Sequence, residues 1–204
     1  MKVLIACEYS GVVREAFTKA GHYAVSCDLL PTDQPGVHYQ GPIQNLLYTA
    51  EWDMMIAFPP CTHLAVSGAR YFKDKREQQE DALDFVRQLM NAPIHYIAIE
   101  NPVGVISSRI RRPDQIIQPY QFGEDASKKT CLWLKNLPKL APTKYMQGRY
   151  INGKLRWSNQ TDSGQNRLTP SPTRGHDRAK TYQGIADAMA NQWGNLWGNQ
   201  WGNL

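Results

Sequence analysis

The sequence predicts an α/β fold in which a mostly parallel sheet, with an antiparallel edge, carries flanking helices. Short apolar runs alternate with stretches of helical periodicity over the first hundred residues, as expected for parallel strands joined by crossover helices. Beyond residue 110, two strand-like runs follow one another without a helix between them, which predicts antiparallel pairing. The length of 204 residues and the apolar fraction of 42% suit one domain with its own core.

Each element of the first half has a boundary signal. The run 3–6 is bounded by Ser10 and Gly11, and the amphipathic stretch 11–20 is followed by Gly21. The run 53–58 ends at Pro59 and Pro60, since proline cannot continue a ladder of hydrogen bonds. The predicted strands are 3–6, 23–27, 53–58 and 94–99, the predicted helices are 11–20 and 73–91, and a loop rich in proline and glycine spans 31–42.

The second half is less regular. Residues 115–122 and 129–134 have strand patterns, and 182–193 is a final short helix. The segment 139–181 is polar and weakly periodic, and a loop of that length is usually functional or mobile. We therefore expect a single domain over 1–192, followed by a low-complexity tail over 193–204 that repeats Trp-Gly-Asn with Leu or Gln.

Charge and cysteine content narrow the class of protein. The net charge of +5 favours a polyanionic partner such as nucleic acid, although many basic proteins bind no polyanion. The apolar run at the N-terminus is too short for a signal peptide or a membrane span. We therefore expect a cytoplasmic protein with reduced thiols and no metal site, because no CxxC pair occurs among Cys7, Cys27, Cys61 and Cys131.

Polar residues follow four of the predicted strands. They are residues 6–11, Asp28, 58–62 and 100–102. Ligands of open α/β sheets bind beyond the carboxyl ends of the strands, so we expect these segments to form one crevice. There is no GxGxxG pattern to hold a pyrophosphate, but Asp28 is placed to bind a ribose diol, with a solvated aspartate as the alternative.

Cys61 follows two prolines on a stiff turn at a strand end. It is either a nucleophile that faces the crevice or a buried structural thiol, which is the commonest fate of a cysteine outside a disulfide. Glu100, at the end of the next strand along the chain, favours the nucleophile. Lys128, Lys129 and the arginines at 109, 111 and 112 are either phosphate contacts or a solvated basic face.

Pro59-Pro60-Cys61 followed by Glu100-Asn101-Pro102 resembles the Pro-Cys and Glu-Asn-Val motifs of DNA cytosine-5 methyltransferases. Residues 2–11, Asp28 and the strand that begins at 52 look like the cofactor half of that family, and 178–186 looks like its last motif. Gln165-Asn166-Arg167 is similar to its Gln-x-Arg-x-Arg motif, although Thr169 replaces the second arginine. Over about 1–194 the chain resembles the short members encoded by bacteriophages and prophages, which lack a large target-recognition domain.

The resemblance implies a Rossmann-like, S-adenosylmethionine-dependent methyltransferase fold, DNA as partner (single- or double-stranded), and the cytoplasm of a bacterial or phage-infected cell. It implies that Cys61 adds to the base, that Glu100 in its protonated form bonds ring nitrogen 3, and that Arg167 assists. The implied cofactor residues are Ala6, Cys7, Glu8, Ser10, Gly11, Asp28, Phe58, Pro59, Thr181 and Gly184, and the implied substrate residues are Pro60, Thr62, His63, Asn101 and Pro102. For two of them a structural role is the alternative, since Asn101 can fix the turn instead and His63 can be an ordinary structural histidine.

Two alternatives stay open at this point. One is a related enzyme that modifies carbon 5 of a pyrimidine in a nucleotide, or uses another one-carbon or carboxymethyl donor. The other is a non-catalytic phage factor that binds DNA or protein. The second would need neither Cys61 nor Glu100.

Overall fold

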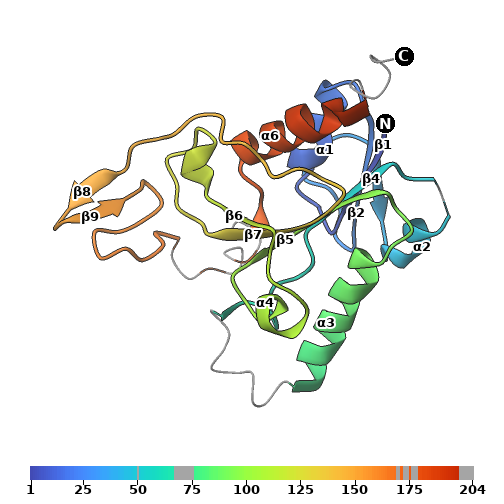
Figure 1. Ribbon diagram of the computed structural model, residues 1–204, viewed down its shortest axis with the longest axis horizontal. Coiled ribbons are helices and arrows are strands. Elements are labelled where there is room, and N and C mark those ends of the chain that lie inside the picture. Colours follow the sequence, from blue (N-terminus) through green and yellow to red (C-terminus); the bar gives the residue numbers. More distant parts are fainter. Residues whose placement is uncertain (50, 67–75, 169–170, 172–174, 176–178, 198–204) are drawn as a thin grey trace.

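The computed structural model describes the chain except residues 50, 67–75, 169–170, 172–174, 176–178 and 198–204. Its centre is one seven-stranded sheet between two layers of helices (Figure 1). The strands, in the spatial order β3-β2-β1-β4-β5-β7-β6, are β3 (His38–Gln40), β2 (Tyr23–Asp28), β1 (Lys2–Ala6), β4 (Met54–Ala57), β5 (Tyr96–Pro102), β7 (Thr130–Lys135) and β6 (Gln115–Ile117).

The strand directions confirm the predicted fold class. Neighbouring strands from β3 to β5 are parallel, whereas β7 is antiparallel to both β5 and β6. This is the mostly parallel, Rossmann-like sheet with an antiparallel edge that the sequence predicts.

Helices cover both faces of the sheet (Figure 1). One face carries α1 (Val12–Lys19) and α6 (Gln183–Gly194), which pack on alternate residues of the strands such as Ile5 and Ile56. The other face carries α3 (Arg76–Met90) and two short helices, α2 (Gln44–Leu47) and α4 (Ile106–Arg109). Because the central strands are buried on both faces, their sequences are continuous apolar runs rather than alternating ones.

Several predicted boundaries were wrong. The loop at 31–42 contains β3, and the predicted strand 115–122 ends at Ile117, because Pro119 begins a 3-10 turn (Pro119–Gln121). The long segment 139–181 contains a small hairpin of β8 (Arg149–Ile151) and β9 (Lys154–Arg156). The first residues of the predicted helix 73–91 lie outside the described part of the chain, which has α3 from Arg76.

Trp193, the first tryptophan of the repeats, belongs to the core. It is fully buried in α6, and its indole Nε1 donates to the Pro138 carbonyl at 2.9 Å. A 3-10 turn (Asn195–Trp197) follows the helix, and residues 198–204 lie outside the described residues. Ordered structure therefore continues past residue 192 into the first repeat. No described helix is long and apolar enough to cross a membrane.

Gly184 explains how closely α6 approaches the loop after β6. A Cβ at this position would lie 1.9 Å from the Phe122 carbonyl oxygen, so Gly184→Ala must displace α6. We expect this variant to lose about 1–3 kcal/mol of unfolding free energy, as overpacked core sites do. Urea unfolding measures the change, with Gly175→Ala as control, because a Cβ there meets no atom within 4 Å. Equal unfolding free energies of the two variants would contradict the close approach of Gly184 to the Phe122 carbonyl.

Candidate functional site

The carboxyl ends of four parallel strands meet at one edge of the sheet. Register pairs Ala6 of β1 with Cys27 of β2 on one side and with Ala57 of β4 on the other, and Ala57 with Ile99 of β5. The four polar segments of the sequence therefore begin at the same level of the sheet, as predicted. Phe58 and Glu100 each follow a paired residue by one position.

The Pro-Pro-Cys turn after β4 is fixed by Asn101 of β5. Asn101 is 1% exposed, and its amide Nδ2 donates to the Pro59 carbonyl at 2.7 Å. The Cys61 carbonyl accepts hydrogen bonds from the N–H groups of Leu64 and Ala65, at 3.0 and 2.9 Å. Cys61 itself is exposed. The structure therefore does not support the alternative of a buried structural thiol.

The loops after β4 and β5 are in direct contact beyond this bond. Val105 N–H donates to the Leu64 carbonyl at 2.8 Å, and Val66 N–H donates to the Val103 carbonyl at 3.1 Å. Between them Gly104 approaches so closely that a Cβ would lie 2.0 Å from the Leu64 oxygen. The glycine thus allows the loop that carries Cys61 and the loop that follows Glu100 to form one unit.

Glu100 lies on β5 next to the antiparallel strand β7. Burial raises the pKa of its carboxyl group, while the positive charge of Lys128 and a hydrogen bond with the Thr130 side chain oppose the rise. Glu100 is therefore more readily protonated than an exposed glutamate. A protonated carboxyl can donate a hydrogen bond, which a carboxylate cannot.

The other three cysteines are poor nucleophiles. Burial is the largest cause of a raised thiol pKa at Cys7, Cys27 and Cys131, and the charge of Asp28 adds to it at the first two. Glu100 has the same effect on Cys131. A thiol whose pKa is raised contains little of the reactive thiolate at neutral pH.

A cavity of about 220 Å³ opens beside the ends of β1 and β2. Three of the predicted residues line it: Cys7, Asp28 and Pro60. Apolar walls come from Leu29, Ile43 and Phe85. One Asp28 carboxylate oxygen accepts the N–H of Leu30 at 2.9 Å. Cys7 has φ of 58°, a left-handed conformation that is uncommon outside glycine and turns the chain at this wall.

Three predicted cofactor residues bind α1 instead of lining this cavity. Glu8, 4% exposed, accepts the N–H of Val13 at 2.7 Å and the N–H of Arg14 at 3.4 Å, and Ser10 donates to it at 3.1 Å. Gly11 precedes the helix with φ of 73°. Burial raises the pKa of Glu8, although these donors oppose the rise. The carboxyl group of Glu8 thus occupies the anion-binding end of the helix.

Arg14 is a buried cation that sequence reasoning missed. Its guanidinium donates to Ser26 Oγ at 2.7 Å and to the carbonyls of Gln34 and Pro35 at 2.8 and 2.9 Å, which fixes the loop after β2. A Cβ on Gly36 would lie 2.6 Å from its Nε. The available signal was its position at the buried spacing of α1, between Val13 and Phe17.

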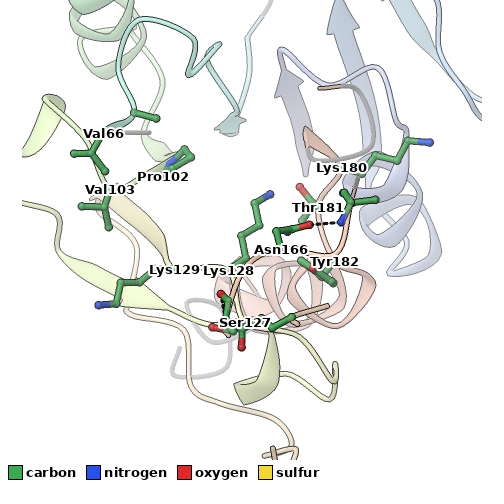
Figure 2. Close-up of a pocket in the computed structure, with 14 residues that line it drawn as sticks. Val66, Pro102, Val103, Ser127, Lys128, Lys129, Asn166, Lys180, Thr181 and Tyr182 are labelled. Carbon is green, nitrogen blue, oxygen red and sulfur yellow. Dashed lines mark hydrogen bonds between the residues drawn. The ribbon is translucent and has the colours of Figure 1, made fainter. Parts of the chain in front are cut away.

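A second cavity, of about 480 Å³, has Ala65 and Val66, which follow the Pro-Pro-Cys turn, among its lining residues (Figure 2). Pro102 lines it, as does Thr181, which the sequence assigned to the cofactor instead. Asn166 and Leu168 line it, but Arg167 between them does not. The Arg167 side chain instead donates from Nε to the Gln160 carbonyl at 2.8 Å. The last predicted motif begins at residue 178, which lies outside the described residues.

Neither of these two cavities is lined by Cys61, by Glu100 or by the remaining predicted residues. Ala6 is buried in the sheet and its carbonyl accepts the Phe58 N–H at 2.9 Å. Thr62 is exposed, and the half-buried His63 uses its carbonyl to accept Gln79 Nε2 at 3.0 Å. Gly184 packs on Phe122, as described above.

The chain has distant similarity to several solved structures, whereas no family model and no curated protein matches it. A DNA modification methyltransferase encoded within an E. coli prophage is 16% identical, with a TM-score of 0.49 over 72% of this chain and 52% of that one. Spodoptera frugiperda DNMT2 is 15% identical (TM-score 0.44, 76% and 56%), and an rRNA methylase from Escherichia coli is 12% identical (TM-score 0.40, 66% and 56%). The chain spans about half the length of these structures. The fold assignment rests on the strand order.

Asn101 should contribute to stability through its bond to Pro59. Asn101→Ala leaves the buried Pro59 carbonyl without this donor, so we expect a loss of about 1–3 kcal/mol of unfolding free energy. Asn91→Ala is the control, since that exposed amide donates to the Arg87 carbonyl at the end of α3. Denaturant unfolding compares the two. If Asn101→Ala loses no more unfolding free energy than the control, the hydrogen bond from Asn101 does not stabilise the Pro-Pro-Cys turn.

Glu100 should make stability depend on pH. Because its pKa is raised in the folded state above the ordinary value of 4.5, the folded protein holds this proton more tightly than the unfolded chain. The resulting stabilisation is present below pH 4.5 and is lost as pH rises through the folded pKa. Glu100→Gln should therefore lose less stability than the wild type over that rise, as measured by unfolding across a pH series. The same dependence of unfolding free energy on pH in Glu100→Gln and the wild type would contradict the raised pKa of Glu100.

Proposed function

We propose that this chain is an S-adenosylmethionine-dependent methyltransferase that methylates carbon 5 of cytosine in DNA through a covalent adduct with Cys61. One observation carries the proposal: an exposed thiol and a carboxyl group with a raised pKa lie at the ends of neighbouring parallel strands. The Asn101–Pro59 hydrogen bond joins the two segments. A protein that only binds nucleic acid has no need of this pair.

The loop that carries Cys61 contributes residues to both cavities, although Cys61 itself and Glu100 are in neither lining. Pro60, immediately before Cys61, lines the smaller cavity beside Asp28, and Ala65, four residues after Cys61, lines the larger cavity beside Pro102. A thiol that must reach a base, while a methyl donor approaches that base from the other side, needs a position between the two binding sites. The placement therefore supports the smaller cavity as the donor site and the larger one as the base site.

The smaller cavity fits the nucleoside half of S-adenosylmethionine. Asp28, at the end of β2, can accept hydrogen bonds from a ribose diol, as acidic residues do at this place in related sheets. Leu29, Ile43 and Phe85 supply apolar surface for an adenine ring. The end of α1 does not offer a site for the cofactor's carboxylate, because Glu8 occupies it. When bound, the cofactor supplies an electrophilic methyl group on a sulfonium.

Cys61 begins the reaction as a thiolate. Its sulfur forms a bond to carbon 6 of the cytosine, and the electron pair of the 5,6 double bond moves into the ring, which makes carbon 5 nucleophilic. Carbon 5 would then be the nucleophile for the electrophilic methyl group that a bound S-adenosylmethionine supplies, with the cofactor's thioether as the leaving group. Loss of the proton on carbon 5 to a solvent base and departure of the Cys61 thiolate restore the double bond. The exposure of Cys61 gives solvent access for that last step.

Glu100 assists the addition of the thiolate. Its protonated carboxyl donates a hydrogen bond to ring nitrogen 3 and so stabilises the charge that the attack pushes into the ring. The raised pKa provides the protonated form at higher pH than an exposed glutamate would. The backbone pairing of β5 with both β4 and β7 fixes the place of this group.

A covalent trap tests the proposal. With tritiated S-adenosylmethionine and an oligonucleotide that contains 5-fluorocytosine, the wild type should form a stable adduct, because fluorine cannot leave as the proton does. Cys61→Ser should form none, and Glu100→Gln should slow methylation of ordinary cytosine by about 10²–10⁴-fold. Adduct formation is read by denaturing gel and methylation by label transfer.

Cys131→Ser is the control for loss of a thiol, since that thiol is buried in β7 and faces Glu100; this variant should still form the adduct, and only the rate can change. Label transfer that survives in Cys61→Ser would overturn the assignment of the nucleophile. Binding of DNA without any adduct would favour the non-catalytic alternative, and labelling of a free nucleotide but not of DNA would favour the nucleotide-modifying enzyme.

A further inference from the structure

The larger cavity has a positively charged lining. Its described lining residues include Lys128, Lys129 and Lys180 but neither aspartate nor glutamate. Hydroxyl and amide groups come from Ser127, Thr181 and several others, and apolar surface comes from the loops after β4 and β5. A cavity of about 480 Å³ with this chemistry suits a nucleotide with its phosphate.

Lys128 is the lysine that faces into this cavity. In Figure 2 its side chain extends into the middle of the lining residues, whereas the side chains of Lys129 and Lys180 extend outward. The ammonium of Lys180 forms an ion pair with Asp33 at 2.8 Å, on the loop after β2. Lys128 thus places positive charge where a ligand of the cavity would lie.

The main chain at Lys128 is held by surrounding segments. Lys128 N–H donates to Gln118 Oε1 at 2.9 Å, and the Thr130 hydroxyl donates to the Lys128 carbonyl at 3.1 Å. The preceding Ser127 exchanges two hydrogen bonds with the side chain of Asn159, at 3.0 and 2.9 Å. A lysine on so constrained a backbone loses less freedom on binding an anion than one on a free loop.

Arg167 does not supply a cation to the cavity. It is exposed, it is absent from the lining, and its Nε donates to the Gln160 carbonyl. The cation that the sequence placed on Arg167 is therefore found on a different segment, immediately before β7.

We propose that Lys128 binds the backbone phosphate next to the reacting cytosine and so positions the base between Cys61 and Glu100. An ammonium is a compact point charge, which favours an anionic phosphate oxygen over the neutral carbonyl of the base. The identity of the base rests on the function proposed above, whereas the phosphate contact rests on the cavity alone.

The same lysine connects phosphate binding to Glu100. Within the described part of the chain, the groups that act on the Glu100 carboxyl include Lys128, the Thr130 hydroxyl and the Cys131 thiol. The charge of Lys128 lowers the pKa of Glu100, and a bound phosphate would offset that charge. Phosphate binding thus favours protonated Glu100, and by linkage protonated Glu100 strengthens phosphate binding.

Binding of a short single-stranded, cytosine-containing oligonucleotide tests the proposal. The full chain is titrated against a fluorescent oligonucleotide at several salt concentrations, and anisotropy gives the dissociation constant. Lys128→Gln should weaken binding about tenfold and reduce the salt slope by about 0.7, the share of one phosphate contact on a single strand. Lys128→Arg should restore both, and the exposed Lys139→Gln, remote from the cavity lining, should match the wild type.

A pH series gives a readout that mere loss of structure would not reproduce. Affinity of the wild type should fall as pH rises through the raised pKa of Glu100, and this dependence should disappear in Glu100→Gln and weaken in Lys128→Gln. Equal affinity and salt slope in Lys128→Gln and the wild type would overturn the proposal, as would a wild type that binds no oligonucleotide at low salt. A wild type that binds through Lys128 but forms no fluorocytosine adduct would instead refute the proposed chemistry and leave the phosphate contact standing.

Discussion

β5 is hydrogen-bonded on both edges, to parallel β4 on one side and to antiparallel β7 on the other, and the candidate site depends on this pairing. The parallel edge brings the ends of β4 and β5 to the same level, so that Asn101 can reach the Pro59 carbonyl. The antiparallel edge brings the start of β7, with Lys128 and Thr130 nearby, to the carboxyl end of β5. One strand therefore places a thiol loop and a cation on opposite sides of the same carboxyl group.

The end of α1 is the second constraint on the site. A helix N-terminus attracts anions, and in many nucleotide-binding sheets this end is left for a ligand. Here Glu8 fills it from within the protein, with Ser10 as a further donor, and Arg14 in the first turn fixes the loop that follows β2. The consequence is a turn beside Asp28 at which the usual site for an anionic ligand is already filled by a carboxyl group of the protein.

The sequence predicted the sheet well because buried parallel strands are continuous apolar runs with clear ends, as at 3–6 and 53–58. It missed β3 and the β8–β9 hairpin because three-residue polar strands have no such pattern. It also placed Cys61, Glu100 and Asp28 after strands whose carboxyl ends meet at one edge, since neighbouring parallel strands end on the same side of the sheet. The sequence did not predict the directions of the side chains. Glu8 faces α1, and Thr181 lines the larger cavity. Arg167 donates a hydrogen bond to a carbonyl, although its two neighbours line that cavity.

A single short loop, from Phe58 to Ala65, forms part of the wall of both cavities. Pro60 lines one cavity and Ala65 the other, so a change in the course of this loop would alter both walls. The outer walls differ in this respect, because Gly41–Gln44 line the smaller cavity alone and Ser127–Lys129 line the larger one alone. Substitutions in those outer segments should accordingly alter one cavity and leave the other unchanged.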